Sequence, residues 1–138
     1  MSRRNTMNLE AIQERIRDIN REIADLGLKV IDEGTGQQKM EYWLPEEIKQ
    51  MLIEEQKRPD GKKTNIALVK YFLGGFTWWA SEYEPRPDEH IGDFFGVVDG
   101  LCKEMGSFNL KEMRDVRLKN IWPVERDFHF TPKPLGEC

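Results

Sequence analysis

The sequence predicts an α+β fold: a mostly antiparallel sheet of about four strands, with helices packed on one face and an N-terminal heptad helix. Two hydrophobic periods support this prediction. Apolar residues recur at helical spacing over residues 9–26, and β-rich runs begin at Ile66. A chain of 138 residues is the usual size of one domain. We expect an amphipathic helical arm with a linker over residues 1–40 and the α+β domain over residues 41–138.

The N-terminal helix is predicted by a stripe of apolar residues with alternating spacings of three and four. The stripe consists of Leu9, Ile12, Ile16, Ile19, Ile23 and Leu26. Asn8 suits the N-cap, and Gly27 suits the left-handed position after the helix. Such a stripe packs on the chain's own domain or, as a coiled-coil seam, on a second chain. Both interpretations stay open, and the second is a homodimer through Leu9, Ile12, Ile16, Ile19 and Ile23.

A second helix is predicted after the mixed segment 28–41, which indicates a weak hairpin or a linker. Pro45 followed by Glu46 and Glu47 is typical of a helix start, because proline suits the first turn and acidic side chains complement the helix dipole. This helix must end before Pro59, where a turn sequence begins.

Residues 66–84 predict a β-hairpin, because two β-rich runs meet at the glycine pair Gly74-Gly75. A two-residue turn at this point places Leu73 opposite Phe76 and fixes the pairing of the residues on either side.

The predicted pairing assigns the hairpin residues to two faces. One face is almost wholly apolar but includes Glu82, and it should look into the core. The other face is mixed and carries Lys70, Trp79 and Tyr83, with Lys70 opposite Trp79 and suited to a cation–π contact.

Further strands and one short helix follow the hairpin. Residues 94–98 and 102–108 predict two strands. Asn109 followed three residues later by Glu112 resembles a capping box and predicts a helix start. Apolar and polar residues alternate over 124–130, which predicts a last strand.

Composition excludes several classes of protein. The net charge of −4 disfavours a protein that coats nucleic acid. No apolar run is long enough to span a membrane, and the basic start lacks the apolar core of a signal peptide. Cys102 and Cys138 form no disulfide framework and fit a reducing compartment. We therefore expect a cytoplasmic protein that does not engage a membrane, with Cys102 buried as a small side chain.

The sequence contains no phosphate-binding loop, serine-hydrolase elbow or zinc motif, so no catalytic residue, metal or cofactor is predicted from motifs. The predicted last strand nevertheless presents three titratable residues on one face, namely Glu125, Asp127 and His129. A metal-dependent nuclease or phosphodiesterase would use these three together with Glu82, Asp93 and Asp99. The favoured interpretation is the solvated face of an edge strand.

Arg126 lies on the apolar face of the same predicted strand and should point inward. A buried arginine needs a carboxylate partner. Glu82, on the apolar face of the hairpin, and Asp99 are the candidates, so we expect a structural ion pair or the anchor of a polar pocket in an otherwise aromatic core.

Charged residues form a basic segment over 57–63 and an acidic segment over 82–93. A basic turn beside aromatic rings can bind single-stranded nucleic acid. The residues for such a site are Lys62, Lys63, Lys70, Trp79 and Tyr83. The acidic loop, with Asp88 and Glu89, would instead engage a basic surface on a partner protein. Charged runs of this kind are more often simply solvated.

Four segments together resemble a known family. They are FTWWASEY at 76–83, FFGVVDG at 94–100, EMGSFNLKEM at 104–113 and VERDFHFTPKPL at 124–135. Over residues 42–135 the chain resembles the bacterial domain of unknown function, family 2958, which is often found on plasmids and other mobile elements. Phe76 stands where the family usually has tryptophan, Ser107 replaces an aromatic residue, and the leader before Tyr42 is additional to the resemblance. The resemblance implies a bacterial or phage cytosolic setting near genes for conjugation or defence evasion, and it implies no reaction.

The missing catalytic motifs, the separate heptad helix and the acidic loop favour a non-enzymatic protein-interaction module of a mobile element or phage. Its expected partner is another protein, and its expected role is inhibition of a host defence nuclease, of the anti-CRISPR or anti-restriction type. Two alternatives stay open. One is the metal-dependent nuclease or phosphodiesterase, and the other is a single-stranded nucleic-acid-binding module, which the net charge does not favour.

Overall fold

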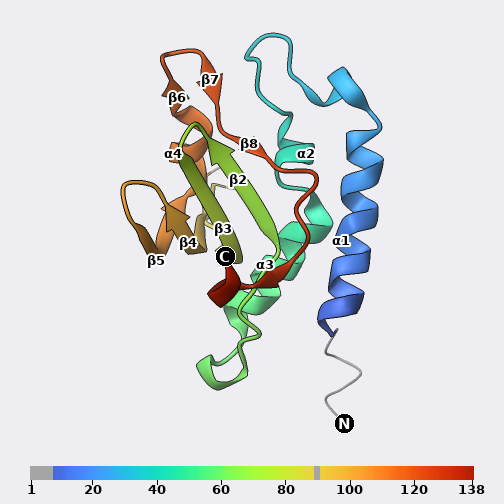
Figure 1. Ribbon diagram of the computed structural model, residues 1–138, viewed down its shortest axis with the longest axis vertical. Coiled ribbons are helices and arrows are strands. Elements are labelled where there is room, and N and C mark those ends of the chain that lie inside the picture. Colours follow the sequence, from blue (N-terminus) through green and yellow to red (C-terminus); the bar gives the residue numbers. More distant parts are fainter. Residues whose placement is uncertain (1–7, 89–90) are drawn as a thin grey trace.

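An antiparallel sheet with strand order β5-β4-β3-β2-β8 lies at the centre of the computed structural model, which describes residues 8–88 and 91–138 (Figure 1). The strands are β2 (Val69–Leu73), β3 (Phe76–Glu84), β4 (Asp93–Asp99), β5 (Lys103–Asn109) and β8 (Glu125–Arg126). Two short strand pairs flank the sheet, β1 (Ile66–Ala67) with β9 (Lys133–Pro134) and β6 (Arg117–Leu118) with β7 (Trp122–Pro123). The predicted α+β class and mostly antiparallel sheet are confirmed.

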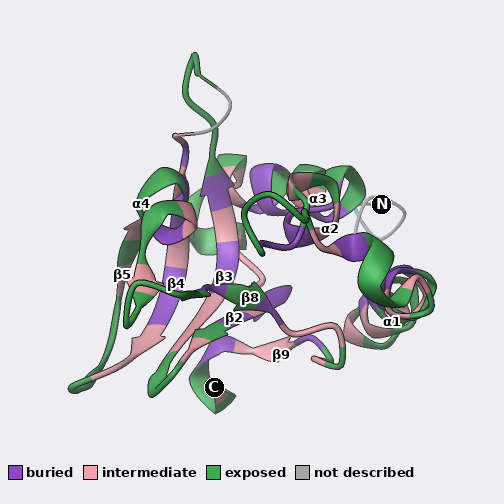
Figure 2. Ribbon diagram, turned by 90° about the horizontal axis from the view of Figure 1, so that it is seen from above, coloured by how far each residue is buried: buried purple, intermediate pink, exposed green. Residues whose placement is uncertain are grey.

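Four α-helices accompany the sheet in the described residues: α1 (Leu9–Ala24), α2 (Met40–Trp43), α3 (Glu46–Lys57) and α4 (Leu110–Asp115). Single 3-10 turns lie at Gly27–Val30, Asp60–Lys62 and Leu135–Glu137. Figure 2 shows buried residues in the middle of β3 and β4 and in α2 and α3, whereas the turns that join the strands are exposed. No helix in residues 8–88 and 91–138 combines the length and apolar character needed to cross a membrane.

The hairpin of β2 and β3 has the predicted register near its turn. Leu73 pairs with Phe76 and Tyr71 with Trp78. Gly74 adopts a φ of 57° in this turn, a left-handed conformation that glycine reaches without steric cost. Local turn chemistry therefore suffices to fix the pairing of these two strands.

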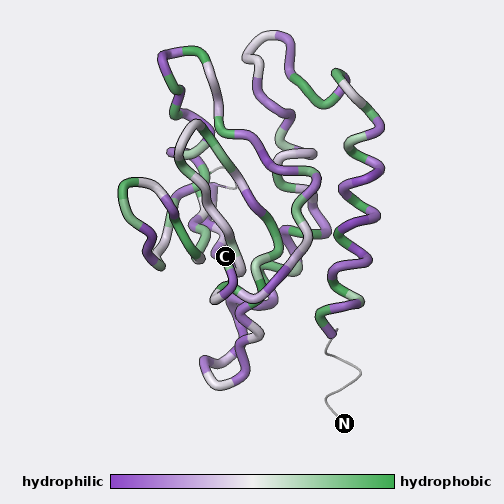
Figure 3. The backbone as a smooth tube through the Cα atoms, viewed as in Figure 1, coloured by the Kyte–Doolittle hydropathy of each residue, from purple (hydrophilic) through white to green (hydrophobic). Residues whose placement is uncertain are grey.

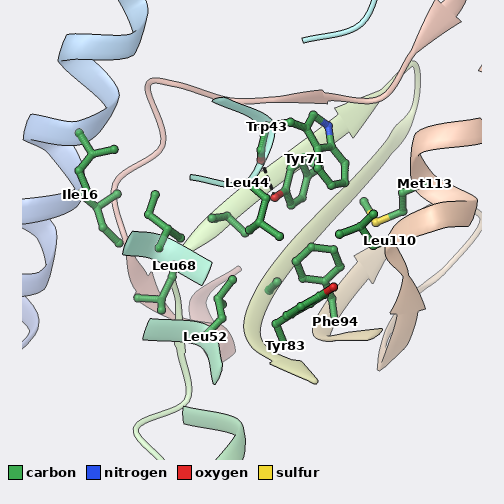
Figure 4. Packing of buried hydrophobic residues seen from close by; sticks show 14 of the residues in the cluster. Ile16, Trp43, Leu44, Leu52, Leu68, Tyr71, Tyr83, Phe94, Leu110 and Met113 are labelled. Atoms are coloured by element: carbon green, nitrogen blue, oxygen red, sulfur yellow. Dashed lines mark hydrogen bonds between the residues drawn. The ribbon is translucent and has the colours of Figure 1, made fainter. Parts of the chain in front are cut away.

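The core lies between the helices and one face of the sheet, and aromatic rings fill its centre (Figure 4). The rings of Trp43 and Tyr71 are 4.2 Å apart, and those of Tyr83 and Phe94 are 4.9 Å apart. Tyr71 donates a hydrogen bond to the Trp43 carbonyl at 2.8 Å, and Trp43 Nε1 donates to the Val124 carbonyl at 3.1 Å. The polar atoms that these large side chains carry into the core are thus paired.

Helix α1 packs on the chain's own core. The Asn8 side chain accepts a hydrogen bond from the Ala11 amide at 2.8 Å, which confirms the predicted N-cap. The heptad residues Ile12, Ile16, Ile19 and Ile23 are buried in the cluster that contains Trp43, and Leu9 packs at its edge. Homodimerisation through this stripe is therefore a wrong interpretation, because the side chains that would form the seam are already covered within one chain.

The last predicted strand is shorter than expected. Strand β8 ends at Arg126, and a turn follows in which the Asp127 carboxylate accepts a hydrogen bond from the His129 amide at 2.8 Å. Aspartate favours such turns because its side chain bonds to the backbone two residues further on. Polar alternation over 124–130 therefore does not reflect a continuous strand.

Candidate functional site

A β-bulge in β3 determines which of the predicted site residues reach the surface. The pairing of β3 with β4 shifts between Ala80 and Glu82, so that Ala80 faces Gly96 and Tyr83 faces Phe94. An extra residue in one strand reverses the facing of everything beyond it. Glu82 consequently lies on the face opposite the aromatic core, and Tyr83 is fully buried within that core. The predicted positions of both side chains are wrong for this reason.

The residues proposed for nucleic-acid binding do not form one surface. Tyr83 is buried, and Trp79 is half-buried in a small second cluster with Leu135. The cation that lies over the Trp79 ring belongs to Lys103, at 5.9 Å, and Lys70 instead forms an ion pair with Asp127 at 3.5 Å. The stacking platform that such a site requires is therefore absent from this group of residues.

Lys63 has a structural role at the end of α3. Its Nζ donates to the carbonyl oxygens of Glu55 and Gln56, both at 2.8 Å, and pairs with Glu82 at 3.3 Å. A lysine in this position satisfies carbonyls that have no partner within the helix. Of the two lysines expected in the basic turn, Lys62 alone remains exposed.

The acidic segment is tied down at its far end. Asp93 accepts hydrogen bonds from Arg86 and, at 3.0 Å, from the Asn109 side chain, and both bonds hold the pKa of the Asp93 carboxyl below its usual value. Asp88 lies on an exposed loop. Glu89 and His90 lie outside the described residues.

The carboxylate–histidine set proposed for a metal-dependent reaction is scattered. Glu82 on β3 pairs with Phe95 on β4, whereas Asp99 lies four residues further along β4 and pairs with Thr77. At ~3.3 Å per residue, the two acids are about 13 Å apart along the strands. Asp127 and His129 lie in the turn beyond β8, and Glu125 is exposed on β8 itself. Among residues 8–88 and 91–138, no three His, Cys, Asp or Glu side chains come together in a way that could hold a metal ion.

Arg126 is buried as predicted, but its partners are neutral. The side chain is 2% exposed, and it forms no ion pair with Glu82, Asp99 or another carboxylate of the described residues. Its Nη1 donates to Asn20 Oδ1 at 2.6 Å and its Nε to the Tyr42 carbonyl at 2.8 Å. The predicted ion pair is wrong because the bulge turns Glu82 to the other face.

The environment of Arg126 leaves its charge incompletely compensated. The guanidinium stacks on the Phe128 ring at 4.7 Å, and its Nη2 has no hydrogen-bond partner in the part of the chain that the structure describes. Burial lowers the pKa of Arg126 to about 10, so the side chain remains a cation at neutral pH. Helix α1 supplies Asn20 and thus provides one of the hydrogen-bond acceptors of this buried cation.

Several exposed apolar side chains of the described residues lie at the end of the molecule where three turns meet. We name this surface the apolar tip, and it consists of Phe76, Leu101, Val116, Leu118, Ile121 and Trp122. Leu101 is 99% exposed, Ile121 65% and Trp122 58%. Cys102, which we expected to be buried, is exposed in the same turn as Leu101.

Close contacts join the three turns of the apolar tip. A Cβ atom on Gly74 would lie 3.0 Å from Leu118, and one on Gly100 would lie 2.2 Å from the Phe76 ring. The hairpin of β6 and β7 therefore touches the β2–β3 turn, and that turn touches the β4–β5 turn. Figure 1 shows β6 and β7 beside the upper end of β2 and β3, and Figure 3 shows hydrophobic stretches in this hairpin.

The β6–β7 turn is tight and places two successive residues in the left-handed region. Lys119 and Asn120 adopt φ angles of 54° and 61°, which place two successive non-glycine residues in the left-handed region. The Ile121 amide donates a hydrogen bond to the Leu118 carbonyl at 3.0 Å, and together with these angles it forms the tight turn that commonly closes β-hairpins. Arg117 and Lys119 give the segment 116–123 a positive charge, since it contains no acidic residue.

The sequence offers one weak signal for the apolar tip that the predictions did not use. Ile121 and Trp122 follow directly after Lys119-Asn120, a typical turn sequence, and Pro123 prevents them from continuing into a long strand. Two large apolar residues in so short a hairpin have little space to be buried.

Comparison with known proteins gives a family and no characterised relative. No curated protein and no solved structure matches the chain. The family described as "Protein of unknown function (DUF2958)" matches residues 43–136, which include the whole sheet and the apolar tip and leave out α1. The chain therefore belongs to the family of proteins of unknown function DUF2958.

Proposed function

We propose that this chain is a non-enzymatic protein-interaction module that binds a partner protein through the apolar tip. The observation that carries the proposal is the clustering of Phe76, Leu101, Leu118, Ile121 and Trp122 in exposed turns at one end of the molecule. Contiguous apolar patches are uncommon on single-chain proteins unless they bind something. Aromatic residues and arginine are also the types enriched at protein interfaces.

The chemistry of the apolar tip indicates the kind of partner. Trp122 and Ile121 suit an apolar recess, and Arg117 and Lys119 favour acidic side chains at its border. Because the family resemblance implies a mobile-element setting, we place the partner among bacterial cytoplasmic proteins of host defence, with a nuclease as the first candidate. Occupation of such a nuclease would make the chain an inhibitor.

The experiment compares a variant of the apolar tip with a matched control. In the double variant Ile121→Ser/Trp122→Ser, polar side chains replace the two anchors in an exposed hairpin, so the fold should be retained. Leu28→Ser is the control, because Leu28 is 89% exposed and lies in the 3-10 turn that follows α1, outside the apolar tip. Each protein is used to isolate partners from the natural host, and the recovered protein is then purified and titrated against all three.

Support requires a stoichiometric complex with the partner protein, which wild type and Leu28→Ser bind with equal affinity. The double variant should bind this partner at least about tenfold more weakly, as expected for the loss of central aromatic anchors. Affinity should also fall with added salt, because the proposed border contacts are ionic. Equal binding of the partner by all three proteins would overturn the proposal. So would self-association through the tip, seen by sedimentation, that the double variant abolishes.

A further inference from the structure

A pocket of about 350 Å³ lies between α1 and residues 128–131, away from the apolar tip. In Figure 1 the chain after β8 runs down beside α1, and the Gln13 side chain ties the two together by donating to the Pro132 carbonyl at 2.8 Å. The volume of this pocket lies within the range of pockets that hold small molecules.

The lining of the pocket combines cations with aromatic rings. Arg17 and Arg21 come from successive turns of α1, and Phe128, His129 and Phe130 come from the opposite side. Arg17 has no ion pair in the described part of the chain, and Arg21 has one long contact with Asp18 at 3.6 Å. Both guanidinium groups are therefore available to an anion, and arginine matches the geometry of a phosphate.

The buried cation Arg126 lies directly behind this lining. Its guanidinium contacts Asn20 and Phe128, both of which also line the pocket. The Asp127 carboxylate attracts this charge but does not outweigh its burial, which is unfavourable, and an anion in the pocket would offset the remaining positive potential of Arg126 through one layer of side chains. This adds an electrostatic reason for an anion that is independent of the two surface arginines.

Asp25 is the one acidic side chain among the described residues of the lining, and it restricts the kind of anion. A carboxylate repels a bare phosphate ion but accepts hydrogen bonds from hydroxyl or amino groups. Phe128 packs against the main core and Phe130 against the second cluster, and the exposed parts of these two half-buried side chains give this side of the pocket an apolar surface against which a planar group can pack. A ligand that fits all three features carries a phosphate, hydrogen-bond donors and a planar ring.

We propose that the pocket between α1 and residues 128–131 binds a nucleoside monophosphate, with Arg17 and Arg21 on the phosphate and the base against the Phe128–Phe130 side. Helix α1 lies outside the part of the chain that matches the family, so half of this site comes from the segment that precedes the match. The site is separate from the apolar tip and does not depend on the proposed function.

The test is a titration of the full chain with adenosine monophosphate, followed by amide chemical shifts in NMR spectra. Adenosine, ribose 5-phosphate and inorganic phosphate form the other arms, which separate the contributions of base and phosphate. Arg17→Gln/Arg21→Gln removes the two exposed cations. Lys111→Gln is the control for charge, because Lys111 is an exposed lysine on α4 outside the pocket lining.

We expect saturable shifts in residues 17–25 and 128–131, with the double arginine variant binding about tenfold or more weakly and Lys111→Gln binding as the wild type does. Adenosine and inorganic phosphate should each bind at least about tenfold more weakly than the nucleotide. Shifts that do not saturate by about 10 mM, a range weaker than ordinary ligand affinities, would overturn the proposal. The proposal would also be overturned if Lys111→Gln lost as much affinity for the nucleotide as the double arginine variant does, or if inorganic phosphate bound as tightly as the nucleotide.

Discussion

Replacement of Gly96 tests the bulge that sets the two faces of β3. A Cβ atom on Gly96 would lie 1.8 Å from the Trp79 carbonyl oxygen and 2.9 Å from the Ala80 Cα. Real contacts of a Cβ atom almost never fall below 3.0 Å, so β3 and β4 would have to separate by about 1.2 Å. Both neighbours are backbone atoms, so a change of side-chain rotamer cannot relieve the clash.

The cost of Gly96→Ala follows from this separation. Weakening of about two ladder hydrogen bonds costs roughly 1 kcal/mol each, and overpacking costs a further 1–3 kcal/mol. We therefore expect the free energy of unfolding to fall by about 3–5 kcal/mol. Gly106 pairs with Gly96 across the β4–β5 ladder, and a Cβ there would meet nothing within 4 Å. Gly106→Ala should be neutral or stabilise by about 0.5 kcal/mol, because alanine loses less chain entropy on folding.

Urea unfolding of the two variants, followed by circular dichroism, measures the difference between these paired sites. A difference of at least about 3 kcal/mol between the free energies of unfolding of the two variants supports the described approach of the β3 backbone to Gly96. A Gly96→Ala variant within about 1 kcal/mol of Gly106→Ala would refute it, and with it the reason for the burial of Tyr83.

Three further variants test the pairing of buried and half-buried polar groups. Tyr71→Phe should lower the free energy of unfolding by about 1–2 kcal/mol, because it leaves the buried Trp43 carbonyl without its 2.8 Å hydrogen bond; no change in urea unfolding would contradict this pairing. Lys63→Met should cost about 2–3 kcal/mol by the same measurement, since the Lys63 side chain is 12% exposed and donates to two helix carbonyls, and a neutral result would mean that solvent replaces it. Asp93→Asn should reduce the loss of stability on acidification: hydrogen bonding from Arg86 lowers the pKa of Asp93 in the folded protein, so its contribution is complete above the unfolded value of about 3.9 and is lost as the pH falls below it. The free energy of unfolding is measured by urea unfolding at each pH. If it falls equally in wild type and Asp93→Asn between pH 7 and pH 3, the Arg86 contact is contradicted.

Features that depend on neighbouring residues could be predicted from the sequence. The Gly74-Gly75 turn fixes the register of β2 and β3, and Asn8 caps α1, because each involves residues within a few positions of each other. The α+β class followed from the change of hydrophobic period at Ile66. The family resemblance over residues 42–135 is likewise confirmed by the match over 43–136.

Features that depend on distant parts of the chain could not be predicted. The bulge at Ala80–Glu82 has no signal in the alternation of residues, yet it reverses the facing of Glu82 and Tyr83. Arg126 meets Asn20, which lies 106 positions earlier, and amphipathic spacing gives no indication of such a polar contact. The proposed boundary at residue 40 coincides closely with the start of the family match, whereas the hydrophobic core extends across it into α1.

The apolar tip was missed for a related reason. Its residues come from three turns whose proximity depends on the contacts of Gly74 with Leu118 and of Gly100 with Phe76. Each turn alone contains one or two apolar residues, which is ordinary for a protein surface. The patch exists because the fold brings these turns together.

The most direct test of the proposed function is site-specific photo-crosslinking in the natural host. A photoreactive benzoylphenylalanine replaces Trp122 in one protein and Leu28 in another, since both positions are exposed and lie on different parts of the surface. Binding through the apolar tip predicts one discrete crosslinked partner from position 122 and none from position 28. The same partner from both positions, or a crosslink from position 28 alone, would contradict the assignment of the tip as the binding surface.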